Sequence, residues 1–254
     1  MAGVWDPGRR AALVASFERS TAPFAHDVGR TAVTALDGYA EQLRAAEQRT
    51  CALDAAGGAS REVAARRRAC LSRSRNQLGN VVDRLLGADL AIQARALTAL
   101  EQLQPIHTCE DLSVLVGDAR DAADPDIARQ AATILDRVDR ARIDSRIGRA
   151  RIALPSVEAA VAEARRLGPG PTLAEALLEL GRTEEQLDRL VDAERDMREA
   201  LLTAQANQVD RLVARAASFL ALDLGRIQER RGEAATLIGL AQATLTRLGS
   251  PPEL

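Results

Sequence analysis

The chain has 254 residues, of which 34 are basic and 36 acidic, and its formal net charge is −2 at pH 7. This balance excludes a global field that would attract nucleic acid or an acidic membrane. Hydrophobic residues make up 46% of the chain and aromatic residues only 2%. A core of Ala, Leu and Val suits helices packed at short distance, since Ala allows close approach and has the best helix propensity.

The first half predicts a series of helices separated by Gly, Pro and capping residues. Asp6 followed by Pro7 is a good helix start, and Ser60 can cap a later helix. A long helix between them carries apolar residues at three- and four-residue spacing. Breaks are predicted at 21–23, 57–58 and 87–89, a fourth helix runs to about residue 103, and a short fifth helix runs from Thr108 to Gly117.

The second half begins after a polar, punctuated stretch at 117–125, where we place the domain boundary. Asp124 and Pro125 cap the next helix. Gly168 followed by Pro169 is a helix stop, and the sequence at 172–175 is a capping box that opens another helix. The expected domains are an N-terminal helical bundle at 1–122 and a second domain at 123–254.

The stretch at 174–204 has a large residue at its position 4, Leu-Gly at 7 and 8, Ala at 20 and Ala-Leu at 27 and 28. This pattern resembles the helix–turn–helix unit of tetratricopeptide repeats, with small residues where two antiparallel helices cross. Equivalent alanines at Ala153, Ala193 and Ala234 are spaced by about 40 residues, against roughly 34 in the standard repeat. The resemblance implies an all-α fold ending in a right-handed α-solenoid, with units near 134–173, 174–214 and 215–250.

A second resemblance covers the first half. It rests on GVWDPGRRAAL at 3–13, TAPFA at 21–25, ALDGYA at 35–40 and RACLSR at 68–73. In this order, the motifs look like the segment that joins the membrane span to tetratricopeptide repeats in myxobacterial eukaryotic-like serine/threonine kinases. The chain has no Gly-rich phosphate loop, no His-Arg-Asp loop and no Asp-Phe-Gly motif, so kinase activity is not carried over.

The three cysteines leave two interpretations open. Free cysteines are often buried as small hydrophobic residues. The kinase resemblance instead implies an extracytoplasmic sensor region, and with it a Cys51–Cys70 disulfide that leaves Cys109 unpaired. Zinc binding is not expected, since no CxxC or His pair has ligand spacing, and no cofactor is predicted.

No chemistry of a catalyst is apparent in the residues. His26 and His107 lie far apart and have no neighbouring nucleophile, so we do not expect an enzyme. The arginine run at 66–68 lacks the aromatic residues that stack on nucleic-acid bases, which favours a solvated face over a nucleic-acid site. No apolar run approaches the roughly 20 residues that span a bilayer, and the N-terminus lacks a signal peptide. As written, the chain is expected to be cytoplasmic, or extracytoplasmic if it belongs to a membrane kinase.

The expected function is binding of a protein or peptide along the concave groove of the repeats. Arg142, Arg146 and Arg182 would form a basic track that grips a carboxylate or an acidic peptide. The alternative is that they pair with Asp139, Asp144 and Glu185 on a solvated face. On either interpretation these arginines are expected to be exposed, so that replacing Arg142 and Arg182 by Ala leaves the fold intact. Repeat positions place eleven residues in the groove: Val138, Arg142, Ser145, Arg146, Glu175, Leu178, Arg182, Glu185, Gln186, Phe219 and Asp223.

Three roles remain open at this point: a sensor-type interaction module of a kinase signalling protein, a cytoplasmic adaptor with reduced cysteines, and a truncated fragment with no independent role. The sequence names neither the ligand nor the oligomeric state.

Overall fold

The computed structural model describes residues 1, 3–57, 60–111, 124–227 and 229–249. This part of the chain is helical and contains no strand. The chain divides into two compact units, one of Met1–Leu115 with Arg146–Gly148 and one of Val116–Ser145 with Arg149–Leu254. The boundary predicted at 117–125 falls mostly on residues 112–123, which lie outside the described residues.

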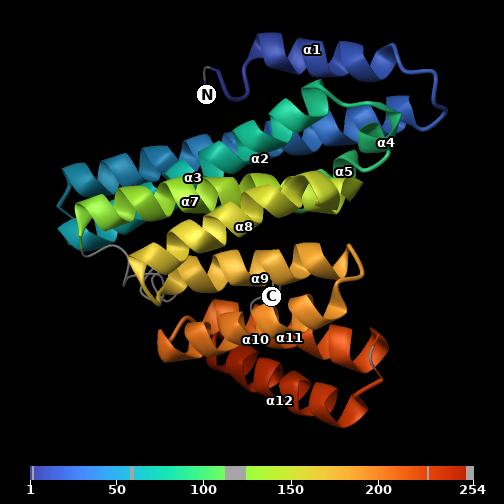
Figure 1. Cartoon of the computed structure of the whole chain (residues 1–254). Coiled ribbons are helices and arrows are strands. Elements are labelled where there is room, and N and C mark those ends of the chain that lie inside the picture. The colour runs from blue at the N-terminus through green and yellow to red at the C-terminus, as the bar shows by residue number, and fades with distance from the viewer. Residues whose placement is uncertain (2, 58–59, 112–123, 228, 250–254) are drawn as a thin grey trace. The chain divides into compact units, whose positions relative to one another are not determined.

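Within its described residues, the first unit has three main helices and three short ones (Figure 1). The predicted caps at its helix starts are present: Asp6 accepts from the backbone N–H of Arg9, and Ser60 accepts from that of Val63. The predicted fourth helix is divided into two short helices by a turn at 94–95. Of the fifth helix, predicted from Thr108 to Gly117, residues 112–117 lie outside the described residues, and its start coincides with the end of a 3-10 turn at Ile106–Cys109. The elements are α1 (Pro7–Glu18), α2 (Ala25–Ala55), α3 (Arg61–Leu86), α4 (Leu90–Gln93), α5 (Ala96–Leu100) and η1 (Ile106–Cys109).

The N-terminal motif attaches α1 to α2. Trp5 is only 6% exposed, and its indole N–H donates to Asp37 Oδ1 at 2.9 Å. The guanidinium of Arg10 contacts the same carboxylate at 2.9 Å. Gly29 of α2 lies against Phe17, so closely that an added Cβ would come within 2.6 Å of the ring. The motif singled out in the sequence therefore has a structural role in this unit.

The disulfide joins Cys70 of α3 to Cys109 of η1, with the two Cα atoms 5.5 Å apart, and Cys51 is an exposed free thiol. The predicted Cys51–Cys70 bond is therefore wrong. The α2 positions that face the core include Leu43, Ala46 and Thr50 at three- and four-residue spacing. Cys51 follows Thr50 by one residue, which turns its side chain about 100° away from that face.

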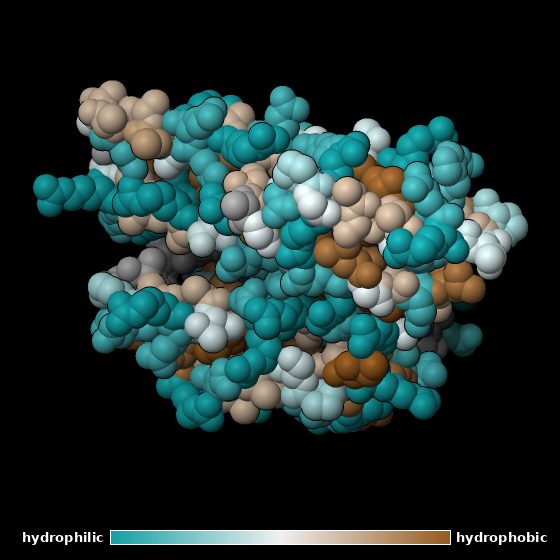
Figure 2. All heavy atoms as spheres, turned by 90° about the horizontal axis from the view of Figure 1, so that it is seen from above, coloured by the Kyte–Doolittle hydropathy of each residue, from teal (hydrophilic) through white to brown (hydrophobic). Residues whose placement is uncertain are grey.

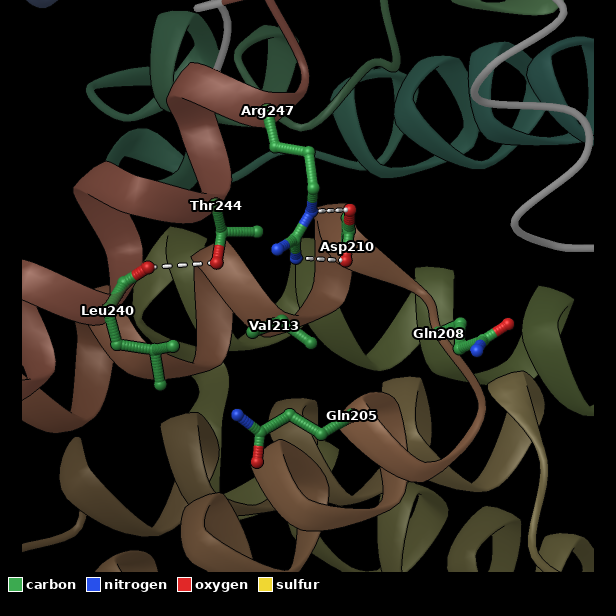
Figure 3. Close-up of a pocket in the computed structure, with 7 residues that line it drawn as sticks. All are labelled: Gln205, Gln208, Asp210, Val213, Leu240, Thr244 and Arg247. Carbon is green, nitrogen blue, oxygen red and sulfur yellow. Dashed lines mark hydrogen bonds and ion pairs between the residues drawn. The ribbon is translucent and has the colours of Figure 1, made fainter.

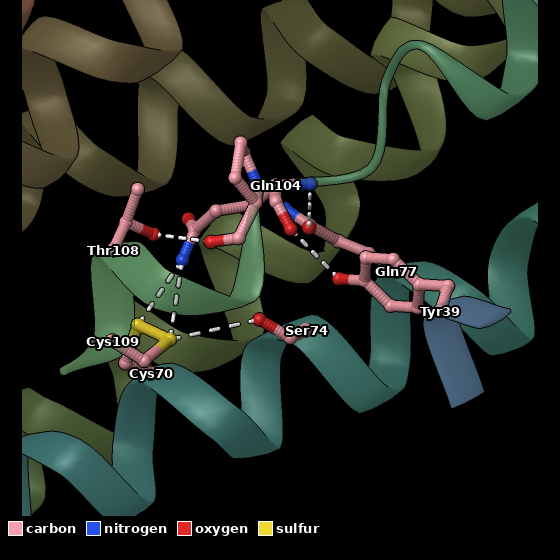
Figure 4. The surroundings of a disulfide bond; sticks show 8 residues. Tyr39, Cys70, Ser74, Gln77, Gln104, Thr108 and Cys109 are labelled. Carbon is pink, nitrogen blue, oxygen red and sulfur yellow. Dashed lines mark hydrogen bonds between the residues drawn. A yellow bond between two sulfur atoms is a disulfide. The ribbon is translucent and has the colours of Figure 1, made fainter. Parts of the chain in front are cut away.

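Gln104 ties the surroundings of this bond together (Figure 4). Its side-chain amide lies 3.1 Å from Cys70 Sγ and 3.4 Å from Cys109 Sγ. Its backbone N–H donates to Gln77 Oε1, and its carbonyl accepts from the hydroxyl of Tyr39. The turn before η1 is thus held to both α2 and α3 by side chains.

The second unit is a succession of helices of which each packs on the next (Figure 1). Asp124 caps α7 and Gly168 ends α8 with a positive φ of 99°, as predicted. The predicted capping box at 172–175 is wrong, because α9 already begins at Pro171 and both Thr172 and Glu175 are buried within it. The elements are α7 (Pro125–Asp144), η3 (Ser145–Arg149), α8 (Ala150–Leu167), α9 (Pro171–Glu185), α10 (Leu190–Ala206), α11 (Asp210–Leu222), η4 (Asp223–Ile227) and α12 (Arg231–Arg247).

Small residues set the spacing of α9 and α10. A Cβ added to Gly181 would lie 2.7 Å from Met197 Cγ and 3.0 Å from the carbonyl oxygen of Ala193. These are the residues in which the sequence predicted a close helix crossing, and the crossing is confirmed. Leu177 and Leu178 fill the space beside it and are almost completely buried.

None of the helices in the described ranges is long and apolar enough to cross a membrane. Figure 2 shows a face that is mainly hydrophilic, with hydrophobic side chains in small separate patches.

Candidate functional site

The candidate site is the face that α7, α9 and α11 share in the second unit, here called the first-helix face. Its side chains are Arg142 of α7, Glu175, Glu179 and Arg182 of α9, and Arg211, Arg215 and Phe219 of α11. Helix α9 packs against both α7 and α11, which brings the three rows of side chains together.

A buried ionic cluster lies between α7 and α9. Arg142 donates from Nη2 to Glu175 Oε1 at 2.9 Å, from Nε to Glu179 Oε2 at 3.0 Å and from Nη1 to Asp139 Oδ1 at 3.0 Å. The Arg142 side chain is 10% exposed and the three carboxylates 5% or less. Arg142 is therefore not an exposed member of a basic track, so the reason for expecting its replacement to leave the fold intact does not hold.

Two further arginines approach the cluster from α11. Arg211 Nη2 lies 3.9 Å from Glu175 Oε2, and Arg215 Nη1 lies 4.0 Å from Glu175 Oε1. The Arg215 guanidinium makes no hydrogen bond within the described residues, and 21% of its side chain is exposed to solvent. Burial, and then the charge of Arg142, lower the pKa of Arg215. The ion pair of Arg215 with Glu175 is longer than the contacts of Arg142 with the three carboxylates.

Arg182 lies over the ring of Phe219, with its guanidinium carbon 3.4 Å from the ring centroid. Such stacking leaves the edge of a guanidinium available for hydrogen bonds while its plane rests on the ring. Both side chains are partly exposed. The sequence placed these two residues in the same groove, and the structure brings them into contact.

The remaining predicted groove residues differ in their burial. Val138, Ser145, Leu178 and Asp223 are completely or almost completely buried, so they support the face from below. Ser145 and Gln186 are hydrogen-bonded at 3.0 Å, with Gln186 exposed, and Glu185 is partly exposed.

Arg146 lies in the segment Arg146–Gly148, which is assigned to the first unit. The predicted basic track of Arg142, Arg146 and Arg182 is contradicted at Arg142, which is buried among three carboxylates. The positive side chains of the face are instead Arg182, Arg211 and Arg215.

Sequence reasoning missed Glu179, Arg211 and Arg215. Glu175 and Glu179 are four residues apart on α9, and Arg211, Arg215 and Phe219 have the same spacing on α11. Residues at i and i+4 lie on one face of a helix, so this spacing was a usable signal. Glu179 falls between the groove positions of the central repeat unit, and Arg211 and Arg215 belong to the third unit, whose repeat pattern is degenerate.

A second feature is an open hollow of about 480 Å³ between the end of α10, the start of α11 and α12 (Figure 3). Val213 and Leu240 line it with apolar surface. Arg247 bridges it by two hydrogen bonds of 2.6 Å to the carboxylate of Asp210, and Gln208 points away from that pair. The two charged groups that line the hollow, Arg247 and Asp210, pair with each other.

Among the described residues, no group of three His, Cys, Asp or Glu side chains is placed to hold a metal ion. Comparison of the chain with protein-family models, with curated proteins and with solved structures gives no match. The site is therefore interpreted from its own geometry.

Proposed function

We propose that the second unit is a tetratricopeptide-like right-handed solenoid that binds a protein or peptide segment along the first-helix face. Three successive helix pairs, α7 with α8, α9 with α10 and α11 with α12, pack against one another. The observation that carries the proposal is that residues assigned to one groove by repeat position meet in pairs: Arg142 with Glu175, Ser145 with Gln186, and Arg182 with Phe219.

The charges of the first-helix face indicate which kind of peptide segment it can bind. Arg142 is already surrounded by three carboxylates, whereas the ion pair of Arg215 within the described residues is the one with Glu175, at 4.0 Å. A guanidinium offers five N–H donors in a planar arrangement that suits a carboxylate. An acidic segment can therefore pair with Arg182 and Arg215 while its apolar side chains contact Phe219.

The test is selection from a displayed library of random peptides, with the purified full chain as bait. We expect enrichment of sequences that contain Asp or Glu, and loss of that enrichment with the double variant Arg182→Gln and Arg215→Gln. Binding of the selected peptides should weaken with salt, because partly exposed charges are screened.

The control is Arg165→Gln. Arg165 is an exposed arginine of α8 that pairs with Glu199 and lies outside the first-helix face. The Arg165→Gln variant should leave the enrichment of acidic peptides unchanged. Circular dichroism checks that each variant is folded. Enrichment of the same peptides with the parent and the double variant would show that the face is not the site.

We also propose that the chain is a sensor-type module of the kind that its sequence resembles in myxobacterial kinases. The disulfide between Cys70 and Cys109 supports an oxidising compartment, since such bonds persist outside the cytoplasm. A cytoplasmic adaptor would instead hold both cysteines as thiols, so the two settings differ in a property that can be measured.

A further inference from the structure

The connection between α9 and α10 contains a second group of buried charges, here called the α9–α10 corner (residues 184–196). The turn has Asp188 with a φ of 58°. The carbonyl oxygen of Glu184 accepts from the backbone N–H groups of Leu187 at 2.9 Å and Arg189 at 3.0 Å. Glu184 is thus the residue around which the chain reverses.

The side chain of Glu184 lies within hydrogen-bonding reach of a second carboxyl group, that of Asp196. Glu184 is 1% exposed and Asp196 is 2% exposed. Arg195 holds Asp196 by two hydrogen bonds, at 2.9 Å and 3.0 Å. Glu184 Oε1 lies 3.3 Å from Arg189 Nη2, but its buried Oε2 accepts no hydrogen bond from the described residues. An oxygen in this position is satisfied if it carries a proton and donates to Asp196.

The other charged groups around the corner do not remove the excess of negative charge. Arg189 also contacts Asp192 at 2.9 Å and Glu158 of α8 at 3.7 Å. Arg195 also contacts Asp192, at 2.7 Å. The corner therefore holds two guanidinium groups, those of Arg189 and Arg195, and four carboxyl groups, those of Glu158, Glu184, Asp192 and Asp196.

The ionisation behaviour agrees with this geometry. Burial raises the pKa of Glu184 from 4.5 to about 7; the charge of Asp196 and its hydrogen bond add to the rise, while Arg189 opposes it. Two carboxyl groups that share a low-dielectric site do not both ionise easily.

We propose that Glu184 and Asp196 share one proton, which makes the α9–α10 corner a pH-dependent joint in the second unit. While the proton is held, the two carboxyl groups bind each other and the corner stays closed. Once the proton is lost, two buried carboxylates repel across the corner and it opens more often. This device does not depend on what the first-helix face binds.

The sign of the effect follows from proton binding. Between pH 4.5 and about 7 the closed corner keeps a proton that the opened chain releases, so raising the pH favours opening. At pH values well above 7 both forms have lost the proton, and the effect approaches a constant value. For one group with these two pKa values, the opening equilibrium rises about 70-fold from pH 5 to pH 8, most of it below pH 7.

Amide hydrogen exchange of the full chain tests the proposal, with rates corrected for the intrinsic effect of pH. Protection of the amides at 186–200 should fall by about 70-fold over that range in the parent protein. In Glu184→Gln it should be nearly constant, because the amide donates to Asp196 at every pH. The control Glu185→Gln changes the neighbouring, partly exposed carboxylate and should keep the parent's pH dependence.

An unchanged pH dependence in Glu184→Gln would overturn the proposal. If that variant does not fold, the parent protein alone decides. The carboxyl carbon of Glu184, followed by NMR, should titrate near pH 7, and a midpoint below pH 5 would contradict a shared proton.

Discussion

The two units stabilise helices in different ways. The first unit has two long helices, α2 of 31 residues and α3 of 26 residues, and fastens them with a disulfide, the docked Trp5 and the hydrogen bonds of Gln104. The second unit has helices of 13 to 20 residues that approach closely through Gly and Ala, and it encloses charged groups between them. The first unit thus relies on a few individual bonds between its elements, and the second unit on close packing of its helices.

This difference predicts where each unit is vulnerable. In the first unit, removing the disulfide, the Trp5 indole or the Gln104 side chain leaves no buried charge behind. In the second unit, Arg142 neutralises three carboxylates that have little contact with water, so its loss affects all three at once. Single charge changes should therefore harm the second unit most, and redox changes the first.

The largest effect is expected from Arg142→Ala. Removing one partner of a buried ion pair costs about 3–5 kcal/mol, because the remaining charge is left uncompensated. Denaturant unfolding of the full chain, with exchange of α9 amides as a local probe, measures the change. The matched control is Arg140→Ala, which removes an exposed partner of Asp136 on the same helix and should cost less than about 1 kcal/mol. Equal costs for the two variants would contradict the role of the buried cluster.

A smaller effect is expected from Cys70→Ala combined with Cys109→Ala. The bond closes a loop with a sequence separation of 39, for which chain entropy gives about 4 kcal/mol as an upper value. The loss should appear in the exchange of α2 and α3 amides and leave α9 and α10 unchanged. Cys51→Ala is the control and should have no such effect, since Cys51 is exposed and unbonded.

The same cysteines test the proposed compartment. Protein taken from its natural host under alkylating conditions should be modified at Cys51 alone. Modification of all three cysteines would favour the cytoplasmic adaptor.

The smallest effect is expected from Trp5→Phe. The substitution keeps an aromatic ring in the buried position and removes the hydrogen bond to Asp37, which is worth about 1 kcal/mol. Thermal unfolding followed by circular dichroism measures it. Arg30→Ala, at an exposed arginine of α2, should change stability by less than about 0.5 kcal/mol. A Trp5→Phe variant as stable as the parent would show that the motif at 3–13 does not hold α1 in place.

Local signals in the sequence predicted local structure well. Asp6, Ser60, Asp124 and Gly168 end or begin helices where expected, because capping depends on neighbouring residues. The close crossing of α9 and α10 at Gly181 was also predictable, since a residue without a side chain lets two helix backbones approach each other. The partner of Cys70 was not, because it depends on the path of residues 87–109 through two short helices and a turn.

The candidate site was predicted in part for the same reason. The periodicity of α9 and α11 brought Arg182 and Phe219 to one face, which is a local property of each helix. The repeat positions placed Arg142 and Glu175 in one groove but did not indicate that Arg142 is buried, because that burial also depends on Glu179, 37 residues away. Charge pairing between helices is a property of their packing.

The exposed thiol of Cys51 makes the first unit accessible to spectroscopy. The chain has one tryptophan, Trp5, and it is buried near the start of the same unit. With Cys70 and Cys109 bonded, a thiol-reactive dye attaches at Cys51 alone. Energy transfer from the indole to that dye then reports the distance between Trp5, which is held to Asp37 of α2, and Cys51 near the end of the same helix, without any engineered residue.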